Sequence, residues 1–199
     1  MGQIGSELVT SLRERYGADA VLATDIRPLS KTVCDSGPTA ILDAQDQNAV
    51  AQATVAHGTD TIFHLAAILS AVGETNPDLA YQINMGTLRS VLEVARLEKC
   101  SVFTPSSIAV FGPTSPKENT PQNTVMRPTT IYGVTKVAGE LLCDYYHRKY
   151  GVDTRGVRYP GLISYGTPPG GGTTDWAVDI FVQAVKKHSY ACFLKEDTT

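Results

Sequence analysis

Tyr132 and Lys136 lie four residues apart in a segment predicted to be helical, so their side chains share one face. A tyrosine is a poor base at neutral pH because its reference pKa is about 10. A cation held nearby stabilises the phenolate and lowers that pKa. The pair therefore suits the removal of a proton from a substrate hydroxyl group. Because such pairs are common by chance, a third residue is needed to support this interpretation.

Ser107 is the candidate for that third residue. It follows a predicted strand and precedes Tyr132 by 25 positions. A hydroxyl group there can donate a hydrogen bond to the substrate oxygen and hold it in place. Ser106 is the neighbouring alternative, and only one of the two serines should face the site because strand side chains alternate. The sequence leaves this choice open.

Gly2 and Gly5 stand at the start of a predicted helix, where backbone N–H groups can approach a pyrophosphate. Asp25 ends the next predicted strand, 20 residues beyond Gly5, a spacing that suits a carboxylate bound to an adenosine ribose. A carboxylate repels a 2′-phosphate, so the pattern favours NAD over NADP, although Arg27 nearby weakens the preference. Without a cofactor, the same residues would form ordinary turns and caps.

Helix-like and strand-like segments alternate along the chain and would position these residues. Apolar spacing predicts helices at 3–16, 46–57, 78–98, 131–150 and 175–187, and β runs at 21–24, 40–42, 61–65, 101–104 and 154–159. We expect Leu79, Ile83, Leu88, Val91, Leu92 and Val94 to form the apolar side of the helix at 78–98. The alternation is typical of an α/β fold with a doubly wound, mostly parallel, Rossmann-like sheet. Ligands then bind beyond the carboxyl ends of the strands.

Composition limits the remaining classes. The 199 residues are 42% hydrophobic and 19% charged, which suits one globular domain. The formal net charge of −3 offers no basic surplus for nucleic acid, and no apolar run is long enough for a membrane span. Four scattered cysteines and four scattered histidines indicate neither a disulfide framework nor a metal site. We expect a reduced, intracellular protein.

The order of these motifs resembles the extended short-chain dehydrogenases/reductases. The resemblance rests on Gly2, Gly5, Asp25, the run Leu65–Ala67, Asn84, Ser106, Ser107, Tyr132 and Lys136. Within that family, the chain is similar to the L-threonine 3-dehydrogenase branch. That similarity is carried by segments 105–113 (PSSIAVFGP), 117–121 (KENTP), 158–164 (RYPGLIS) and 167–175 (TPPGGGTTD).

The resemblance implies a role for each matching residue. It assigns catalysis to Ser107, Tyr132 and Lys136. It assigns NAD contacts to Gly2, Gln3, Ile4 and Gly5 at the pyrophosphate, Asp25 and Ile26 at the adenosine ribose, Asp43 and Ala44 at the adenine, Leu65, Ala66 and Ala67 along the cofactor, Asn84, Tyr132 and Lys136 near a water relay, and Tyr159 and Leu162 at the nicotinamide. It assigns L-threonine contacts to Ser70, Ser107, Tyr132, Thr173 and Thr174.

Simpler interpretations stand beside these roles. The run Leu65–Ala67 could be only strand core, Asn84 could satisfy a buried backbone group, and Thr173 or Thr174 could cap the helix near Asp175. The resemblance also implies a homodimer through the helices at 78–98 and 131–150, which carry more apolar positions than one sheet face needs. It implies a cytoplasmic protein, or one of the mitochondrial matrix in a eukaryote.

The chain departs from the family pattern at both ends. The first glycine of the fingerprint and the strand before it would fall ahead of Met1, and family members continue beyond Thr199 into a substrate lobe. We therefore expect residues 1–199 to be an incomplete NAD-binding domain. Loss of a central strand would cost stability and leave backbone groups unpaired, so we expect weak NAD binding and poor oxidation of threonine.

Two other functions remain open. A sugar-nucleotide epimerase or dehydratase of the same family uses the same Tyr, Lys and Ser set. A non-catalytic nucleotide-binding module would keep cofactor affinity without turnover. The leading interpretation is an NAD-dependent oxidoreductase that converts the β-hydroxyl of L-threonine into the ketone of 2-amino-3-oxobutanoate.

Overall fold

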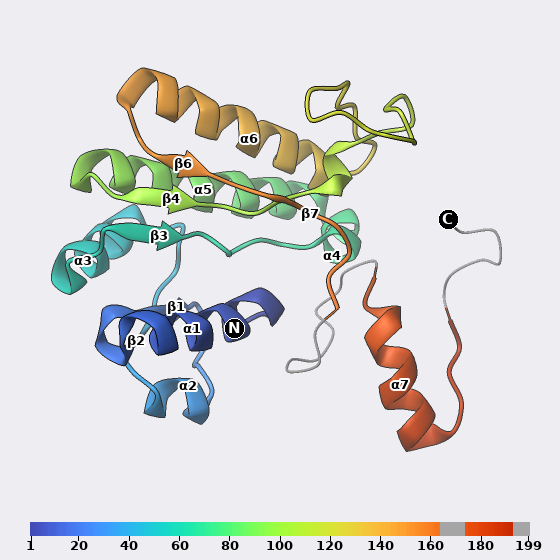
Figure 1. Cartoon of the computed structure of the whole chain (residues 1–199), viewed down its shortest axis with the longest axis horizontal. Helices are drawn as coiled ribbons and strands as arrows, with labels where there is room; N and C mark the ends of the chain where they lie inside the picture. Colours follow the sequence, from blue (N-terminus) through green and yellow to red (C-terminus); the bar gives the residue numbers. More distant parts are fainter. Residues whose placement is uncertain (164–173, 193–199) are drawn as a thin grey trace.

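The computed structural model describes residues 1–163 and 174–192, and every strand pair within them is parallel. The strands form three short sheets (Figure 1). The first pairs β1 (Ala23–Asp25) with β2 (Thr39–Ile41), the second orders β3 (Thr61–Phe63), β4 (Ser101–Phe103) and β6 (Thr154–Arg155), and the third pairs β5 (Ser106–Ser107) with β7 (Arg158–Tyr159). The α/β class and the parallel arrangement predicted from the sequence are confirmed.

The second and third sheets continue one another. Thr104 N donates to Arg155 O at 2.9 Å, and Ser106 N donates to Val157 O at 2.9 Å, so pairing continues on both sides of Pro105. A Cβ on Gly156 would lie 2.6 Å from Thr104 O, so this crossing requires glycine. The strand predicted at 154–159 is therefore two short strands separated by a close backbone approach.

The sheet is interrupted beside β1, as expected for a doubly wound sheet that lacks its first, central strand. Within residues 1–163 and 174–192, β1 pairs with β2 alone and forms no ladder with β3. In Figure 1, β1, β2 and the neighbouring helices lie below β3, apart from the larger sheet. The pairing therefore divides the fold into a small N-terminal unit and a larger unit around β4.

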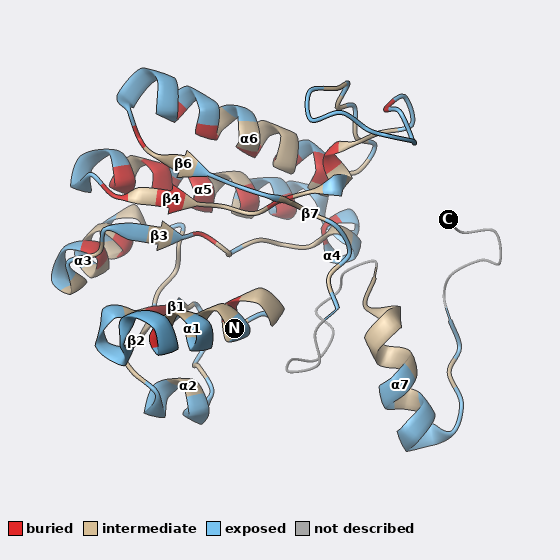
Figure 2. Cartoon of the chain, viewed as in Figure 1, coloured by how far each residue is buried: buried red, intermediate tan, exposed pale blue. Residues whose placement is uncertain are grey.

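Three helices cover one side of the larger sheet. They are α3 (Gln47–His57), α5 (Pro77–Glu98) and α6 (Ile131–Tyr150), and α5 packs against both of the others. Figure 2 shows that buried residues gather on α5 and β4. The core cluster comprises Val50, Leu88, Val91, Leu92, Val94, Ala95, Cys100, Val102, Cys143, Tyr146 and Val152. Leu79, predicted to join this apolar side, is 44% exposed.

Each long helix begins or ends as local chemistry dictates. The Asp46 carboxylate accepts hydrogen bonds from Asn48 N and Ala49 N, and α3 ends at Gly58 in the left-handed region, with φ at 63°. Thr130 Oγ1 accepts from Gly133 N at the start of α6, which ends at Gly151 with φ at 73°. The predicted helix at 131–150 is confirmed to the residue.

A buried arginine holds the N-terminal unit together. Arg13, on α1 (Gln3–Tyr16), donates to the backbone carbonyls of Val21, Val33 and Pro38. These contacts join α1 to β1 and to the short helix α2 (Lys31–Asp35). Since β1 carries Asp25 at its end, Arg13 helps to fix the position of that carboxylate.

The remaining elements are short or exposed. They are α4 (Ser70–Thr75), α7 (Trp176–Lys187) and the 3₁₀ turns Ala18–Ala20 and Ile108–Val110. No residue of α7 is buried, and Phe181 and Val185 are 73% and 79% exposed. Among the described helices, none is both long and apolar enough to cross a membrane.

Candidate active site

The predicted site residues follow the carboxyl ends of the strands. Asp25 is the last residue of β1, Ser107 ends β5 and Tyr159 ends β7. Ser107 and Tyr159 are register partners in one parallel pair. The run Leu65–Ala67 follows β3 in the same direction. This edge is where ligands bind in open α/β sheets, so the structure brings the predicted residues to the edge at which such a site is expected.

Gly133 allows Tyr132, the predicted base, to lie close to Ser107. A Cβ on Gly133 would lie 2.3 Å from Ala109 O, so only glycine allows the start of α6 to approach the turn at Ile108–Val110. Ser107 Oγ accepts from Ala109 N at 3.1 Å, which fixes the hydroxyl at the start of that turn. The Ser107 hydroxyl lies close enough to the phenol of Tyr132 to lower its pKa.

Lys136 lies beneath this pair. Its Nζ donates to Pro105 O at 2.7 Å and lies 5.3 Å from the centroid of the Tyr132 ring. Burial lowers the pKa of Lys136 to about 8, and the nearby Cys143 and Glu140 oppose this effect. The lysine is therefore still largely protonated at neutral pH.

The pKa of Tyr132 differs from the sequence-based expectation. Burial raises it above its usual value, while the hydrogen bond with Ser107 acts in the opposite direction. The expected lowering rested on the Lys136 ammonium together with a nicotinamide cation, and the ammonium alone, which is directed at Pro105 O, does not outweigh the burial of the phenol. In this state, Ser107 is the group that favours the phenolate.

The structure separates the two serines. Ser106 is buried, and its Oγ donates a short hydrogen bond to Glu140 Oε1 on α6. Ser107 takes the opposite direction and meets Tyr132. Ser107 is therefore the serine whose hydroxyl lies beside the predicted base.

The Asn84 side chain forms hydrogen bonds with the backbone of Ile68. Its Oδ1 accepts from Ile68 N at 2.7 Å, and its Nδ2 donates to Ile68 O and to Thr135 Oγ1, both at 3.1 Å. The simpler interpretation, that Asn84 satisfies a buried backbone group, describes these contacts. Since Thr135 precedes Lys136 on α6, Asn84 also connects the segment after β3 to that helix.

The start of α1 has the features of an anion site. Gly2 is its N-cap, and no side chain caps the first turn. Gln3 Nε2 is buried with no hydrogen-bond partner among the described residues. A Cβ on Gly5 would lie 2.9 Å from Met1 Cγ and 3.6 Å from Leu65 Cδ1. An uncapped helix start, an unpaired buried donor and a glycine cradle fit a dinucleotide pyrophosphate.

Asp25 has charged neighbours at this end. Its Oδ1 accepts from Arg27 N at 2.9 Å, and its Oδ2 lies 3.2 Å from the Met1 ammonium. Burial pushes the pKa of Asp25 upward, but these partners outweigh it and hold the pKa below its usual value. The carboxylate is therefore ionised at neutral pH, as ribose binding requires.

The other predicted contacts lie around the same edge. Ile26 is 61% exposed beside Asp25, while Asp43 and Ala44 are half-buried in the turn after β2. Asp43 Oδ1 accepts from Gln45 N at 2.9 Å. Leu42 N donates to Asp25 O at 2.9 Å, which brings this turn to Asp25.

Residues predicted near the nicotinamide and threonine are more widely spread. Ser70 begins α4, and Leu162 is half-buried after β7. Thr174 packs on Gly161, where an added Cβ would lie 2.4 Å from Thr174 Cγ2. The N-cap of α7 is Asp175, so Thr174 is not that cap. Thr173 lies outside the described residues.

A cavity of about 580 Å³ lies beside Lys136, between the segment after β3 and α6, and Ser107, Tyr132 and Asp25 are not among its lining residues. Its walls include Leu65, Ala66, Ala67, Asn84, Lys136 and Arg158. The run after β3 therefore lines open space, beyond any role in the strand core. No group of three potential metal ligands occurs among the described residues.

Sequence reasoning missed three residues around this cavity. His64 is buried behind Lys136, and Glu140 and Arg158 form an ion pair at 2.8 Å. Only Glu140 had a local signal, because it lies four residues beyond Lys136 on the same helical face. The partners of the other two residues are distant in the chain.

Comparison with known proteins shows the family to which the chain belongs. The model of the NAD dependent epimerase/dehydratase family matches residues 1–194. An uncharacterized epimerase/dehydratase of Staphylococcus saprophyticus is 55% identical over 199 residues, which are 100% of this chain and 62% of the relative. The chain thus spans less than two thirds of that relative's length.

Solved structures add a second comparison. An L-threonine dehydrogenase from Clostridium difficile is 55% identical with a TM-score of 0.91, over 98% of this chain and 61% of that one. A GalE-like L-threonine dehydrogenase from Cupriavidus necator, in its holo form, is 53% identical with a TM-score of 0.92, over 98% and 63% of the two chains.

Proposed function

Because this chain belongs to the NAD-dependent epimerase/dehydratase family, we propose that it is part of an NAD-dependent oxidoreductase acting on L-threonine. The reaction converts the β-hydroxyl group into a ketone and yields 2-amino-3-oxobutanoate. The observation that carries the proposal is the proximity of three groups: the Ser107 hydroxyl, the Tyr132 phenol and the Lys136 ammonium. The similarity to two threonine dehydrogenases over 98% of this chain supports the choice of substrate.

Each side chain of the proposed site has a separate role in the reaction. Tyr132 accepts the proton of the β-hydroxyl group as the C–H bond of the same carbon breaks. Ser107 donates a hydrogen bond to the reacting oxygen and keeps it within reach of the phenol. Lys136, positive below a pKa of about 8, stabilises the negative charge that develops on Tyr132. When bound, NAD supplies the acceptor for the hydride.

The cofactor would lie along the edge of the strands. The start of α1, with Gly2, Gln3 and Gly5, would hold the pyrophosphate through backbone N–H groups and the unpaired Gln3 Nε2. Asp25 would accept hydrogen bonds from the adenosine ribose. Ser70, Thr173 and Thr174 would contact threonine, and these assignments rest on the resemblance.

A second candidate function is sugar-nucleotide epimerisation or dehydration. The names of the curated relatives favour it, since they are epimerase/dehydratases of uncharacterized activity. A third, a nucleotide-binding module without catalysis, would bind the cofactor and show no turnover. The first test is therefore NADH formation from L-threonine, compared with turnover of a uridine-diphosphate sugar.

The decisive variant is Tyr132→Phe. It removes the proton acceptor and keeps the ring, so in an otherwise active, full-length form NAD affinity should be retained while threonine-dependent NADH formation falls by roughly 10²–10⁴. Tyr145→Phe is the matched control, because Tyr145 lies on the same helix and is 51% exposed. Retention of most activity in the Tyr132 variant would transfer the role of base to another residue.

A further inference from the structure

Glu140 connects three elements of the candidate site. It lies on α6, one turn beyond Lys136. Its Oε1 accepts hydrogen bonds from Ser106 Oγ and from Arg158 Nε, the latter at 2.9 Å, and its Oε2 accepts from Arg158 Nη2 at 2.8 Å. Ser106 belongs to β5 and Arg158 to β7, so one carboxylate joins the helix to both strands.

Arg158 extends this connection to the loop before α6. Its Nη1 donates to Gln122 O at 3.0 Å, and its Nη2 contacts Met126 Sδ at 3.1 Å. The guanidinium also lies over the Phe111 ring, 5.4 Å from the centroid. Its side chain is only 16% exposed. Contacts with β5, with the Phe111 ring and with the loop before α6 therefore hold the Glu140–Arg158 ion pair in place.

The residues joined by Glu140 stand next to the reacting groups. Ser106 precedes Ser107, Arg158 precedes Tyr159, and Lys136 lies one turn before Glu140. Alternation along β5 directs Ser106 to Glu140 and Ser107 to Tyr132. A shift of the Ser106 side chain would therefore move the Ser107 hydroxyl relative to the phenol.

We infer that Glu140 is a positioning residue, whose carboxylate fixes β5 and β7 against α6 and so holds the Ser107 hydroxyl within hydrogen-bonding reach of Tyr132. The role is distinct from proton transfer, because Glu140 has no contact with the phenol among the described residues. As a catalytic role it rests on the proposed function. Its structural part, the contact between Ser107 and Tyr132, can be measured without turnover.

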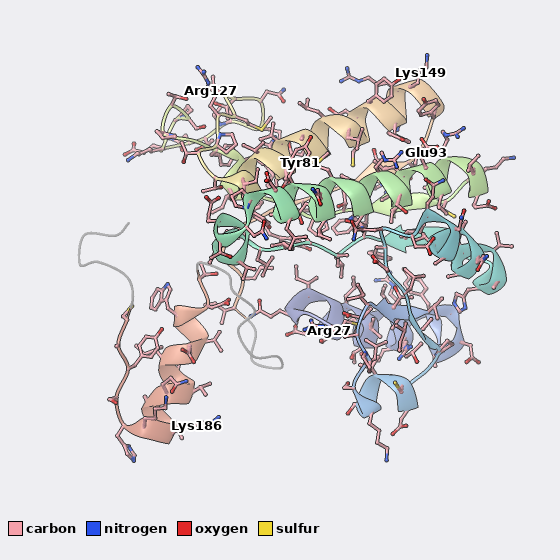
Figure 3. All side chains as sticks on the ribbon, turned by 180° about the vertical axis from the view of Figure 1, so that it is seen from behind. Arg27, Tyr81, Glu93, Arg127, Lys149 and Lys186 are labelled. Carbon is pink, nitrogen blue, oxygen red and sulfur yellow. The ribbon has the colours of Figure 1, made fainter. Side chains whose placement is uncertain are left out.

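The kinetic test compares Glu140→Gln with Glu93→Gln. The amide keeps the shape of Glu140 but turns an N–H group toward the Arg158 donors. Glu93 is a matched control, since it accepts from Tyr146 OH and from Arg96 Nε and Nη2, with 21% side-chain exposure against 23% for Glu140. Figure 3 shows Glu93 near the end of α6 that carries Lys149, and Tyr132 belongs to the first turn of the same helix.

We expect Glu140→Gln to lower kcat for threonine roughly 10–100-fold, as small misplacements of reacting groups do, with little change in the KM for NAD. Glu93→Gln should leave both constants unchanged. Equal losses in the two variants, or an unchanged kcat in Glu140→Gln, would overturn the proposal.

A second measurement separates this inference from the proposed function. The ionisation of Tyr132 is followed by phenolate absorbance, as the difference between each protein and the same protein carrying Tyr132→Phe. The hydrogen bond from Ser107 lowers the pKa of Tyr132. Glu140→Gln should therefore raise that pKa, as Ser107→Ala does, whereas removal of a negative charge by itself would lower it.

The two hypotheses then fail differently. Absence of threonine oxidation by the full-length protein of which this chain is part, together with a raised Tyr132 pKa in its Glu140→Gln variant, rejects the proposed function and keeps the positioning role. An unchanged or lowered Tyr132 pKa rejects the positioning role, whatever the substrate.

A paired variant excludes a merely structural effect. Replacing both partners, with Glu140→Met and Arg158→Met, leaves no unpaired charge and should recover thermal stability relative to Glu140→Gln. The positioning role predicts that kcat stays low and the Tyr132 pKa stays high. If kcat and the Tyr132 pKa returned to their unmodified values together with thermal stability, Glu140 would act through folding alone.

Discussion

The Asp25 carboxylate is the residue that should select the cofactor. It is ionised, it stands at the end of β1, and its neighbours Arg27 and the Met1 ammonium hold its pKa low. We predict tighter binding of NAD than NADP, because a 2′-phosphate would meet this negative charge. Fluorescence titration with the two reduced cofactors measures the preference. Equal or tighter binding of NADPH would refute this role.

The matching variant is Asp25→Ser. Loss of a charged hydrogen-bond acceptor costs about 1.5–3 kcal/mol, so NADH affinity should fall roughly 10–100-fold. The difference in affinity between NADH and NADPH should become smaller at the same time, because the 2′-phosphate of NADPH no longer meets a carboxylate. Asp35→Asn is the control, since Asp35 is an exposed carboxylate at the end of α2 in the same N-terminal unit and is not among the expected cofactor contacts.

Residue types and spacing predicted the part of the site that is local in sequence. Tyr132 and Lys136 share a helical face, and Ser107 and Asp25 end strands, so both relations follow from backbone periodicity. The pair of Glu140 and Arg158 was missed because its members are 18 positions apart and meet only in the fold. The lowered pKa expected for Tyr132 needs a nicotinamide cation beside the Lys136 ammonium, because the burial of the phenol outweighs the ammonium alone.

At the scale of elements, the long helices were the easiest to predict. Their apolar periodicity and their caps, such as Thr130 and Gly151 on α6, mark both ends. The helices α2 and α4 were missed because five or six residues are too few to show a period. The strands are only two or three residues long, so their pairing partners, rather than their composition, define where they end.

Exposed apolar residues on α5 and α6 support the expected homodimer. On α6, Val134, Leu141 and Tyr145 are 42%, 59% and 51% exposed, at spacings of seven and four that form one stripe. On α5, Tyr81 is 50% exposed, and Figure 3 shows it on the outer side of that helix. Two copies of this face would cover the stripe in a self-complementary contact.

We predict that Leu141→Glu, combined with Tyr145→Glu, yields a monomer, because the charges would be buried at the centre of the contact. Sedimentation velocity at micromolar concentration measures the change. Val55→Glu, on α3 and equally exposed at 63% in the unmodified chain, should leave the dimer intact. A monomeric unmodified protein at high micromolar concentration would contradict the assembly.

At the scale of the whole molecule, burial is uneven. The core cluster lies between α3, α5, α6 and β4, while α1, α2 and α7 contribute little to it (Figure 2).

His64 lies at the edge of this core, and its backbone N–H donates to Phe103 O at 2.8 Å. Thr87 Oγ1 donates to Ile83 O, so it can only accept from His64 Nε2, 3.3 Å away. The neutral imidazole therefore carries its proton on Nε2.

This histidine should control the acid limb of global stability. Burial, with a smaller contribution from Lys136, lowers the pKa of His64 to about 4, while the unfolded chain has the ordinary value near 6.5. Between these two values the unfolded state binds the extra proton, so the free energy of unfolding falls as pH falls through that window. The shift corresponds to about 3 kcal/mol lost between pH 6.5 and 4.

Urea denaturation of the unmodified protein and of His64→Gln tests this prediction. Glutamine can still donate to Thr87 but does not titrate, so its free energy of unfolding should depend much less on pH between 6.5 and 4. The carboxylates Asp25, Glu93 and Glu140 have lowered pKa values and lose their stabilising effect mainly below their ordinary range near 4, so they leave the upper part of the window to His64. Equal slopes for the two proteins between pH 6.5 and 5 would show that His64 is protonated without cost, contrary to its burial.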